Sequence, residues 1–552
     1  MQKVPFPILF FCILRSRIKS SYLDFLNSTA KFIESELQTY LTMVDQDFII
    51  KIGVLAAYVG VLFLIGIIAS RRIKGMSDYY VGGKKMGFWA VAFSARATGE
   101  SGWLLIGLTG MGAMAGYSSY WVVIGELLGV IVSWQFMAKR FKKRSDSYGA
   151  ITIPDYLQSH FKSTSHFLRI IAASALVILI VIYVASQIDV TGIAFESMLG
   201  IDYRLGALIG FFIVLSYIFV GGFVAAVWSD LFQGLLMFFG LVLLPIVVWF
   251  SMDHGAGVTE GLNAIDPTLT RVMGQSSDPW MNLFTILGFS MIGLGFLGSP
   301  QVYVRFMSIK DESEINKGKW VAAVFTLLTD AAAVTIGILA RIYFTENGQD
   351  PELILGNNGE NVLSMITESF LPTLLVAVFI AIVLSAIMST IDSLLILASS
   401  AITRDFYQKI FRPYIKDEEL TKISRVATII MAFTALIIAI VMNYVSPDRQ
   451  IFWVIIFGWS GIAATFCPVI ILSLFWKGYS EKGAIASMFS GFFSVILFNF
   501  VFKEMPDIGQ YFVALDVLAP SFAIAILIGV VVSKIFPPRP EAIKMIKEID
   551  AE

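Results

Sequence analysis

Six charged side chains stand inside long apolar stretches of the chain, where a charge is costly and marks a candidate functional position. They are Arg96, Glu100, Glu126, Asp230, Asp330 and Asp392. Arg96 and Glu100 are four residues apart, a spacing that would stack them on a helix as an intramembrane ion pair. Glu126 could instead pair with Arg96, and Asp330 has no partner that the sequence reveals. Carboxylate oxygens are ligands that hard cations prefer, so the pattern indicates cation binding within the membrane.

A second group of hydroxyls points to the same chemistry. Ser385, Ser389 and Ser393 recur every four residues, Thr390 lies beside them, and Asp392 follows Ser389 by three. At 100° per residue these side chains share one broad helical face. Such a face offers hard oxygen ligands to an alkali cation; alternatively, the hydroxyls bond their own backbone or a neighbouring helix. The carboxylate of Asp392 favours cation binding.

The apolar stretch that carries Arg96 and Glu100 is poor material for one continuous helix. Five glycines lie between residues 99 and 115, and glycine is a weak helix former. Small residues also allow helices to pack closely. Broken helices, however, are where transporters bind, because unwound carbonyls can hold a cation while the half-helix ends face the solute. Two charges in the same segment make the binding interpretation the stronger one.

The composition requires a membrane to hold these residues. Of 552 residues, 57% are hydrophobic and 15% charged, against about 45–50% and about 25% in soluble proteins. A net charge of −1 gives no attraction to phosphate, so we expect no nucleic-acid partner. Two cysteines and three histidines are too few for a disulfide framework, a zinc site or histidine-based catalysis. The chain is predicted to be an all-helical, polytopic membrane protein with the lipid bilayer as its partner and no organic cofactor.

Thirteen stretches are long enough to cross a hydrocarbon core, which takes about 20 apolar residues per helix. They lie near 47–70, 86–116, 118–138, 167–190, 204–224, 228–252, 280–307, 320–344, 371–403, 425–445, 451–476, 482–502 and 511–535.

The basic residues predict an orientation. Lys and Arg gather at 71–75, 139–144, 404–425 and in the C-terminal tail. If the segment before the first span lies outside, all four fall inside, as the positive-inside rule requires. The connections then predicted to lie outside hold five basic residues: Arg204, Arg271, Arg341, Arg449 and Lys503. The N-terminus is therefore expected outside and the C-terminus inside.

The chain divides into three parts. Residues 1–42 contain a short apolar run followed by a basic and polar stretch, and they lack a convincing signal-peptide pattern. Since Met43 stands directly before the first span, we interpret 1–42 as an N-terminal extension, which a misassigned start would explain. Residues 43–535 form the predicted transmembrane domain, and 536–552 form an inside tail.

Several long blocks resemble the sodium/solute symporter family, and most of all its sodium/proline symporter branch. The similar blocks run in order through the membrane region: SDYYVGGKKMG (77–87), SGWLLIGL (101–108), ITIPDYLQSHF (151–161), FVGGFVAAVWSDLFQGLLM (219–237), GSPQVYVRFM (298–307) and AIMSTIDSLLILASSAITRDFY (386–407). The resemblance implies a leucine-transporter-type fold, in which spans two to six repeat in inverted topology as spans seven to eleven. It also implies that sodium is the coupling ion for solute uptake.

The resemblance further implies two cation sites. The main sodium site would combine carbonyls of Ala97, Glu100 and Ala386 with the hydroxyls of Ser389 and Thr390. Some relatives hold a second sodium on residues that match four positions of this chain. These are Asp230, Ser389, Asp392 and Ser393.

The solute site implied by the resemblance departs from the proline branch. Ser101, Trp103 and Tyr183 match that branch, whereas Ile292 and Phe296 replace a tryptophan and a tyrosine. An aspartate of the branch corresponds to Gly99, with Glu100 one residue later. The carboxylate could have moved by one position, Glu100 could bind a substrate ammonium, or the solute could be another compound. An aromatic at 103 or 183 could also belong to the core.

The expected function is sodium-coupled uptake of a small solute by alternating access. Proline or a related amino acid is the first solute expected. The alternatives are another solute (a monocarboxylate, a choline-like cation or a sugar) with sodium or proton coupling. A membrane-embedded enzyme would need a clustered catalytic motif, and a transporter-like sensor would need a longer tail than 536–552. The resemblance implies that the protein lies in a plasma membrane, and a bacterial inner membrane is the first expectation.

Overall fold

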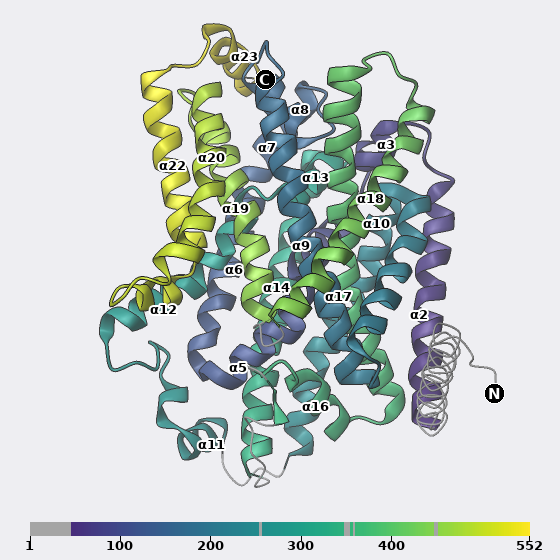
Figure 1. Cartoon of the computed structure of the whole chain (residues 1–552), viewed down its shortest axis with the longest axis vertical. Coiled ribbons are helices and arrows are strands. Elements are labelled where there is room, and N and C mark those ends of the chain that lie inside the picture. Colours follow the sequence, from purple (N-terminus) through teal and green to yellow (C-terminus); the bar gives the residue numbers. More distant parts are fainter. Residues whose placement is uncertain (1–45, 253–256, 347–353, 357–358, 447–450, 552) are drawn as a thin grey trace, which may run out of the picture.

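Long helices run side by side through the molecule (Figure 1). The computed structural model describes residues 46–252, 257–346, 354–356, 359–446 and 451–551, so the predicted extension 1–42 lies outside it. Within those ranges the only β-structure is an isolated bridge between Met86 and Ile309. The expectation of an all-helical fold is confirmed.

The first half of the chain contains the helices that surround the glycine-rich stretch. They are α2 (Gln46–Ser70), α3 (Met76–Val81), η1 (Gly82–Lys84), α4 (Phe88–Gly102), η2 (Trp103–Leu108), α5 (Thr109–Ala115), η3 (Gly116–Ser119), α6 (Tyr120–Val132), η4 (Ser133–Met137), α7 (Ala138–Ser147), α8 (Ile153–His160), α9 (Phe167–Leu199) and α10 (Tyr203–Ser251).

The second half begins with two short helices in a connection and ends with a helical tail. Its elements are α11 (Val258–Ile265), η5 (Pro267–Thr270), α12 (Pro279–Met291), η6 (Ile292–Leu297), α13 (Pro300–Ser308), α14 (Glu312–Glu346), α16 (Val362–Phe370), α17 (Thr373–Ser400), η8 (Ala401–Phe411), α18 (Asp417–Val445), α19 (Ile451–Phe475), α20 (Glu481–Leu497), η9 (Phe498–Phe502), α21 (Gly509–Leu515), α22 (Leu518–Ile535) and α23 (Pro540–Ala551).

Eleven helical stretches of the described chain are long and apolar enough to cross a membrane, and they account for the predicted spans. The 60-residue stretch Phe88–Ser147 holds two of them, because Arg96 and Glu126 approach to 2.9 Å although a straight helix would separate them by about 45 Å. The span predicted near 204–224 is the shorter apolar helix Tyr203–Ile218. It is divided from the next at Gly222, where φ is 52°.

Two spans are interrupted at mid-length, one in each half of the chain. In the first, α4 ends at Gly102 and passes into the π-helical η2. In the second, α12 passes into the 3₁₀ segment η6, and α13 starts after Gly298 and Ser299. Interruption at matching places in two halves is the arrangement that forms ion and solute sites in inverted-repeat transporters.

The interrupted helix α4 lies in the interior, packed against α10, α17, α14 and α13. Helix α17 is mostly buried, whereas α2 and α22 leave most of their surface outward. The site helices therefore form the centre of the molecule, with α2 at one side and α22 at the other (Figure 1).

One predicted boundary is corrected by the structure. The last span begins at Leu518 rather than near 511, because the chain turns at Asp516, where φ is 58°. The tail after 535 contains α23, whose Asp550 lies 2.9 Å from Arg144 at the end of α7.

Candidate functional site

Helix α4 is broken at Ser101, a non-glycine residue with a φ of 50° and a ψ of −168°. This left-handed φ is uncommon for residues that carry a Cβ. In an unbroken helix the Gly102 amide would donate to the Thr98 carbonyl. Instead, it donates to Oε1 of Gln187 on α9, at 3.1 Å. The break therefore leaves helical carbonyls of α4 open to other partners.

The hydroxyls of α17 take up those carbonyls. Ser389 Oγ donates to the carbonyl oxygens of Ala97 and Ala386, at 3.0 and 3.1 Å. Thr390 Oγ1 donates to those of Thr98 and Ala386, at 3.0 and 3.2 Å. Four of the five residues expected at the main sodium site are thus brought together between α4 and α17. All of them are buried.

The region expected to hold a second sodium contains a residue that the sequence reasoning left out. Arg305 of α13 donates from Nη2 to Asp230 Oδ2 at 3.0 Å and from Nε to Ser94 Oγ at 2.8 Å. The same Nη2 also contacts Ser393 Oγ. The guanidinium thus lies against two of the expected ligands, and its side chain is 1% exposed.

Asp392 lies beside this arginine among hydroxyl donors. Its Oδ2 accepts from Tyr217 at 3.1 Å and from Ser229 at 3.5 Å. Its Oδ1 accepts from Ser393 at 2.9 Å. The fourth expected ligand, Ser389, faces the main site instead.

The residues expected to contact the solute fall into two adjoining groups. Tyr183 of α9 donates its hydroxyl to Ser101 Oγ at 3.4 Å. Trp103 donates its indole N–H to the Gly99 carbonyl at 3.3 Å. This first group gathers at the break in α4, where backbone and side-chain polar atoms occur together.

The second group is held by a residue of α19. Trp459 donates its indole N–H to the Ile292 carbonyl at 3.2 Å, and its ring centroid lies 5.0 Å from that of Phe296. The Phe296 ring also approaches α4, because a Cβ built on Gly99 would lie 2.6 Å from it. Phe296 therefore occupies the space that any side chain at position 99 would need.

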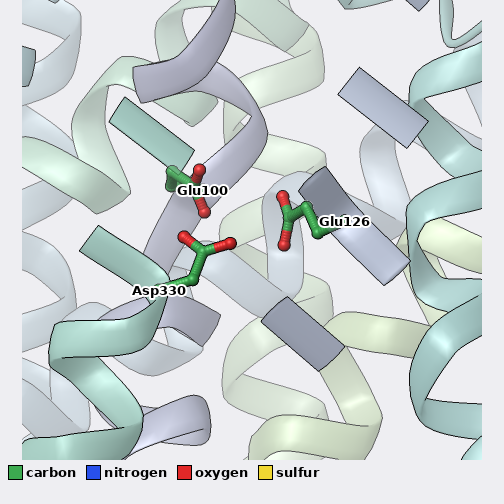
Figure 2. Close-up of side chains that lie close together, drawn as sticks. All are labelled: Glu100, Glu126 and Asp330. Atoms are coloured by element: carbon green, nitrogen blue, oxygen red, sulfur yellow. The ribbon is translucent and has the colours of Figure 1, made fainter. Parts of the chain in front are cut away.

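Three buried carboxylates from different helices meet near Arg96. The Arg96 guanidinium forms ion pairs with Glu100 and, at 2.9 Å, with Glu126 of α6. Asp330 of α14 completes the group, and one carboxylate oxygen of each acid lies within 4.8 Å of the other two. Figure 2 shows the three carboxylates turned toward one another. We call Glu100, Glu126 and Asp330 the acidic cluster.

The sequence reasoning missed several polar residues of these sites: Thr98, Gln187, Arg305 and Trp459. Arg305 stands inside a predicted span, so the rule that singled out six intramembrane charges could have found it. Gln187 and Trp459 carry no such signal.

The family is shown by comparison with known proteins. The model of the "Sodium:solute symporter family" matches residues 79–491. The chain is 32% identical to the high-affinity proline transporter PutP of Bacillus subtilis, over 84% of this chain and 97% of that protein. It is 31% identical to the sodium/proline symporter of Escherichia coli, over 90% and 95% of the two chains. The osmoregulated proline transporter OpuE of Bacillus subtilis is 30% identical, over 89% and 95%.

The fold also matches solved structures. A Na+-coupled sialic acid symporter in a substrate-bound, outward-open state has a TM-score of 0.72 at 20% identity, covering 89% of this chain and 98% of that one. Mhp1, a nucleobase-cation-symport-1 family transporter in a closed conformation, gives 0.51 at 12% identity, covering 85% and 98%. The expected leucine-transporter-type fold is confirmed. The protein is a multi-pass membrane transporter rather than an enzyme, and it belongs to the sodium:solute symporter family.

Proposed function

We propose that this symporter takes up proline or a related amino acid, driven by a sodium ion bound where α17 meets the break in α4. One observation carries the site: the hydroxyls of Ser389 and Thr390 meet carbonyls of Ala97 and Thr98 that the broken helix leaves open. Hydroxyl and carbonyl oxygens are hard ligands. The carbonyls of Ala386 and Glu100 would complete the shell of the ion.

Sodium binding would exchange hydrogen bonds for ion contacts. Without the ion, Ser389 and Thr390 point their protons at the carbonyls, at 3.0 Å in each case. With the ion, the hydroxyls rotate their lone pairs inward, and the ion links α4 to α17. The two helices are then held in one arrangement. A ligand shifts a conformational equilibrium only through different affinities for the two states, and this linkage supplies such a difference.

The solute would lie at the break in α4, beside Ser101, Trp103 and Tyr183, with Ile292 and Phe296 closing the other side. Amino acids have both a carboxylate and an ammonium group, and a broken helix offers backbone donors and acceptors to such a ligand. The curated relatives described above are proline transporters, which supports proline as the first solute to test.

The N-terminus is proposed to lie outside and the C-terminus inside, in a bacterial plasma membrane. Helix α7, which carries lysines and arginines, and the tail helix α23, which carries lysines, meet through Arg144 and Asp550. These two segments therefore share one end of the molecule (Figure 1). The positive-inside rule assigns that end to the cytoplasm. One sodium entering across 100 mV then contributes about 2.3 kcal/mol to uptake before any concentration gradient.

The test is uptake of radiolabelled proline into liposomes under an inward sodium gradient, with potassium and proton gradients as references. We expect sodium-dependent uptake that Ser389→Ala abolishes. Ser399→Ala is the matched control, because Ser399 is buried on the same helix and donates to its own backbone, at the Ile396 carbonyl. Uptake that proceeds equally without sodium would contradict the coupling.

A panel of other solutes separates the ion site from the solute. If proline fails to enter while another compound enters with sodium, the sodium site stands and the solute assignment is wrong. Competition with a monocarboxylate, a choline-like cation and a sugar would then identify the class. We would assign the change of specificity to Gly99, Glu100, Ile292 and Phe296.

A further inference from the structure

The acidic cluster contains more negative charge than its surroundings compensate. Glu100, Glu126 and Asp330 come from α4, α6 and α14, and each is fully buried. Arg96 is the cation paired with Glu100 and Glu126. Three carboxylates with one guanidinium carry a formal charge of −2 in a medium of low dielectric constant, where an uncompensated charge costs several kcal/mol. The cluster therefore requires further positive charge.

The carboxylate oxygens show where that charge would bind. Glu100 Oε2, Glu126 Oε2 and Asp330 Oδ2 are buried, and no N–H or hydroxyl group of the described chain donates a hydrogen bond to them. Among the residues that the structure describes, one hydroxyl reaches the cluster: Thr329 Oγ1 lies 3.1 Å from the other oxygen of Asp330. Buried acceptors are rarely left without partners. Because the three carboxylates are also turned toward one another, they indicate a ligand that is itself positive.

Charged groups on the other helices packed against α4 do not supply it. Asp230 on α10 pairs with Arg305 on α13, and Asp392 on α17 accepts from hydroxyls. These groups gather around Ser94 and Thr98 of α4. At 100° per residue, those two positions are on the opposite face of the helix from Arg96 and Glu100. The carboxylates of the acidic cluster thus lie on the other face of α4 from Arg305, Asp230 and their hydroxyl partners.

We propose that the acidic cluster is a second site for a small coupling cation, which binds and leaves in each transport cycle. The proposal rests on the sodium-coupled uptake proposed above. Hard cations take oxygen ligands at about 2.3–2.6 Å, so one ion can reach three oxygens that lie within 4.8 Å of one another. Protons meet the same need, since carboxyls crowded together hold a shared proton. Sodium and the proton are two sources of the same charge.

The site has a structural route to the transport cycle. Glu100 immediately precedes Ser101, where α4 breaks, and the carbonyl oxygens of Ala97 and Thr98 meet the main site on the same helix. A rearrangement of the break moves Glu100 relative to Glu126 and Asp330, which are on other helices. The distances between the three carboxylates, and so the affinity for a cation, differ between the two states. That difference couples cation binding to alternating access.

The test counts cations per solute in proteoliposomes. Radioactive sodium flux and a lumenal pH dye are measured together with uptake of the solute found by the panel above, in wild type and in Asp330→Asn. We expect two cations per solute in wild type, either two sodium ions or one sodium ion and one proton, and one in the variant. The two arms identify which cation the cluster takes.

Two further variants keep the experiment decisive. Glu126→Gln removes a second ligand and is expected to give the same loss of one cation. Asp189→Asn is the control, because it neutralises a buried carboxylate outside the cluster, one that accepts from Tyr203 at 2.5 Å; we expect its cation ratio to stay at two. One cation per solute in wild type would overturn the proposal, as would a ratio of two that both cluster variants retain.

Failure of the proposed function would look different. If no solute enters with sodium, the uptake assignment fails. Equilibrium binding of radioactive sodium to the detergent-purified protein, at acid and neutral pH, then decides between the sites. If Asp330→Asn removes a bound cation or a bound proton that Ser389→Ala retains, the result would still support a cation site at the acidic cluster. If the two variants bind cations alike, the proposal is overturned.

Discussion

The two faces of α4 deal with buried charge in different ways. On one face, Arg305 and Asp230 lie among hydroxyls: Ser94, Thr98 and Ser393 all contact the guanidinium. On the other face, Arg96 is paired with acids, and within the described part of the chain a single hydroxyl, that of Thr329, approaches them. Hydroxyls donate and accept, so they satisfy a charge without adding another. The Arg305–Asp230 pair is therefore satisfied by its surroundings, whereas the acidic cluster needs further positive charge.

The largest effect is expected from removing the cation on the hydroxyl-rich face. Arg305→Ala leaves Asp230 buried without a counter-charge, and breaking a buried pair by removing one partner costs about 3–5 kcal/mol. The vacated space is lined by Asp230 and Ser393, so sodium should recover part of the loss. Unfolding of purified protein in mixed detergent micelles, in sodium and in potassium, measures both effects.

Arg305→Lys serves as the reference for that comparison. It retains the charge but loses the planar fork that reaches several oxygens at once, so it should lose less stability than Arg305→Ala and gain less from sodium. Equal stability of the wild type and Arg305→Ala would show that the two faces of α4 do not differ in the way proposed.

Hydropathy and local spacing were sufficient to predict the helical spans, the interruption after Gly99 and the oxygen-bearing face of α17. Each of these depends on residues within a few positions of one another. The partners across helices could not be predicted in the same way. Arg305 meets Ser94 across 211 residues, and Trp459 meets Ile292 across 167. Nothing in local periodicity fixes such contacts, because they depend on how the interrupted helices pack.

His160, a titratable residue outside the membrane spans, is buried in the neutral form rather than as a charged group. His160, at the end of α8, is 1% exposed, and its Nδ1 lies 3.1 Å from the Tyr148 hydroxyl. Burial, and next the charge of Arg144, lower the pKa of His160 from 6.5 to about 3. The folded protein therefore holds the imidazole neutral without any ligand. A carboxylate of the acidic cluster becomes neutral only by binding a proton.

The second prediction follows from that lowered pKa. Between pH 6.5 and 3 the unfolded chain binds a proton at His160 that the folded chain does not, so stability falls as the pH falls through this window. At 1.36 kcal/mol per unit, the loss from pH 6.5 to 4.5 is about 2–3 kcal/mol. His160→Gln should lose less stability over this interval than wild type. Unfolding at the two pH values measures it, with the exposed His166→Gln as control; equal slopes for wild type and His160→Gln would contradict it.

A third prediction concerns Gly99, which lies between the two faces of α4. A Cβ at this position would lie 2.6 Å from the Phe296 ring, so Gly99→Ala should cost about 1–3 kcal/mol through overpacking. Because that ring also lies 4.5 Å from the Arg96 guanidinium, displacing it should disturb the acidic cluster and reduce the sodium dependence of uptake.

Gly53→Ala on α2 is the control, since a Cβ there meets nothing within 4 Å and alanine favours the helix. Phe296→Leu combined with Gly99→Ala should recover part of the stability. Additive losses in the double variant would show that the two residues do not share the space.

The smallest effect tests the scarcity of hydroxyls directly. Thr329 Oγ1 donates to its own helix, at the Phe325 carbonyl, and lies 3.1 Å from Asp330 Oδ1. Thr326 donates to the Ala322 carbonyl and is equally buried. Thr329→Val should therefore cost about 0.5–1.5 kcal/mol more than Thr326→Val, the usual net value of one hydrogen bond. This difference in stability should become smaller once a cation occupies the cluster. The ion then balances the charge of the Asp330 carboxylate, which has lost the hydroxyl of Thr329. If the two variants lose the same stability with and without sodium, and at both acid and neutral pH, the contact between Thr329 and Asp330 does not stabilise the protein. The contrast between the two faces of α4 would then depend on the arginines alone.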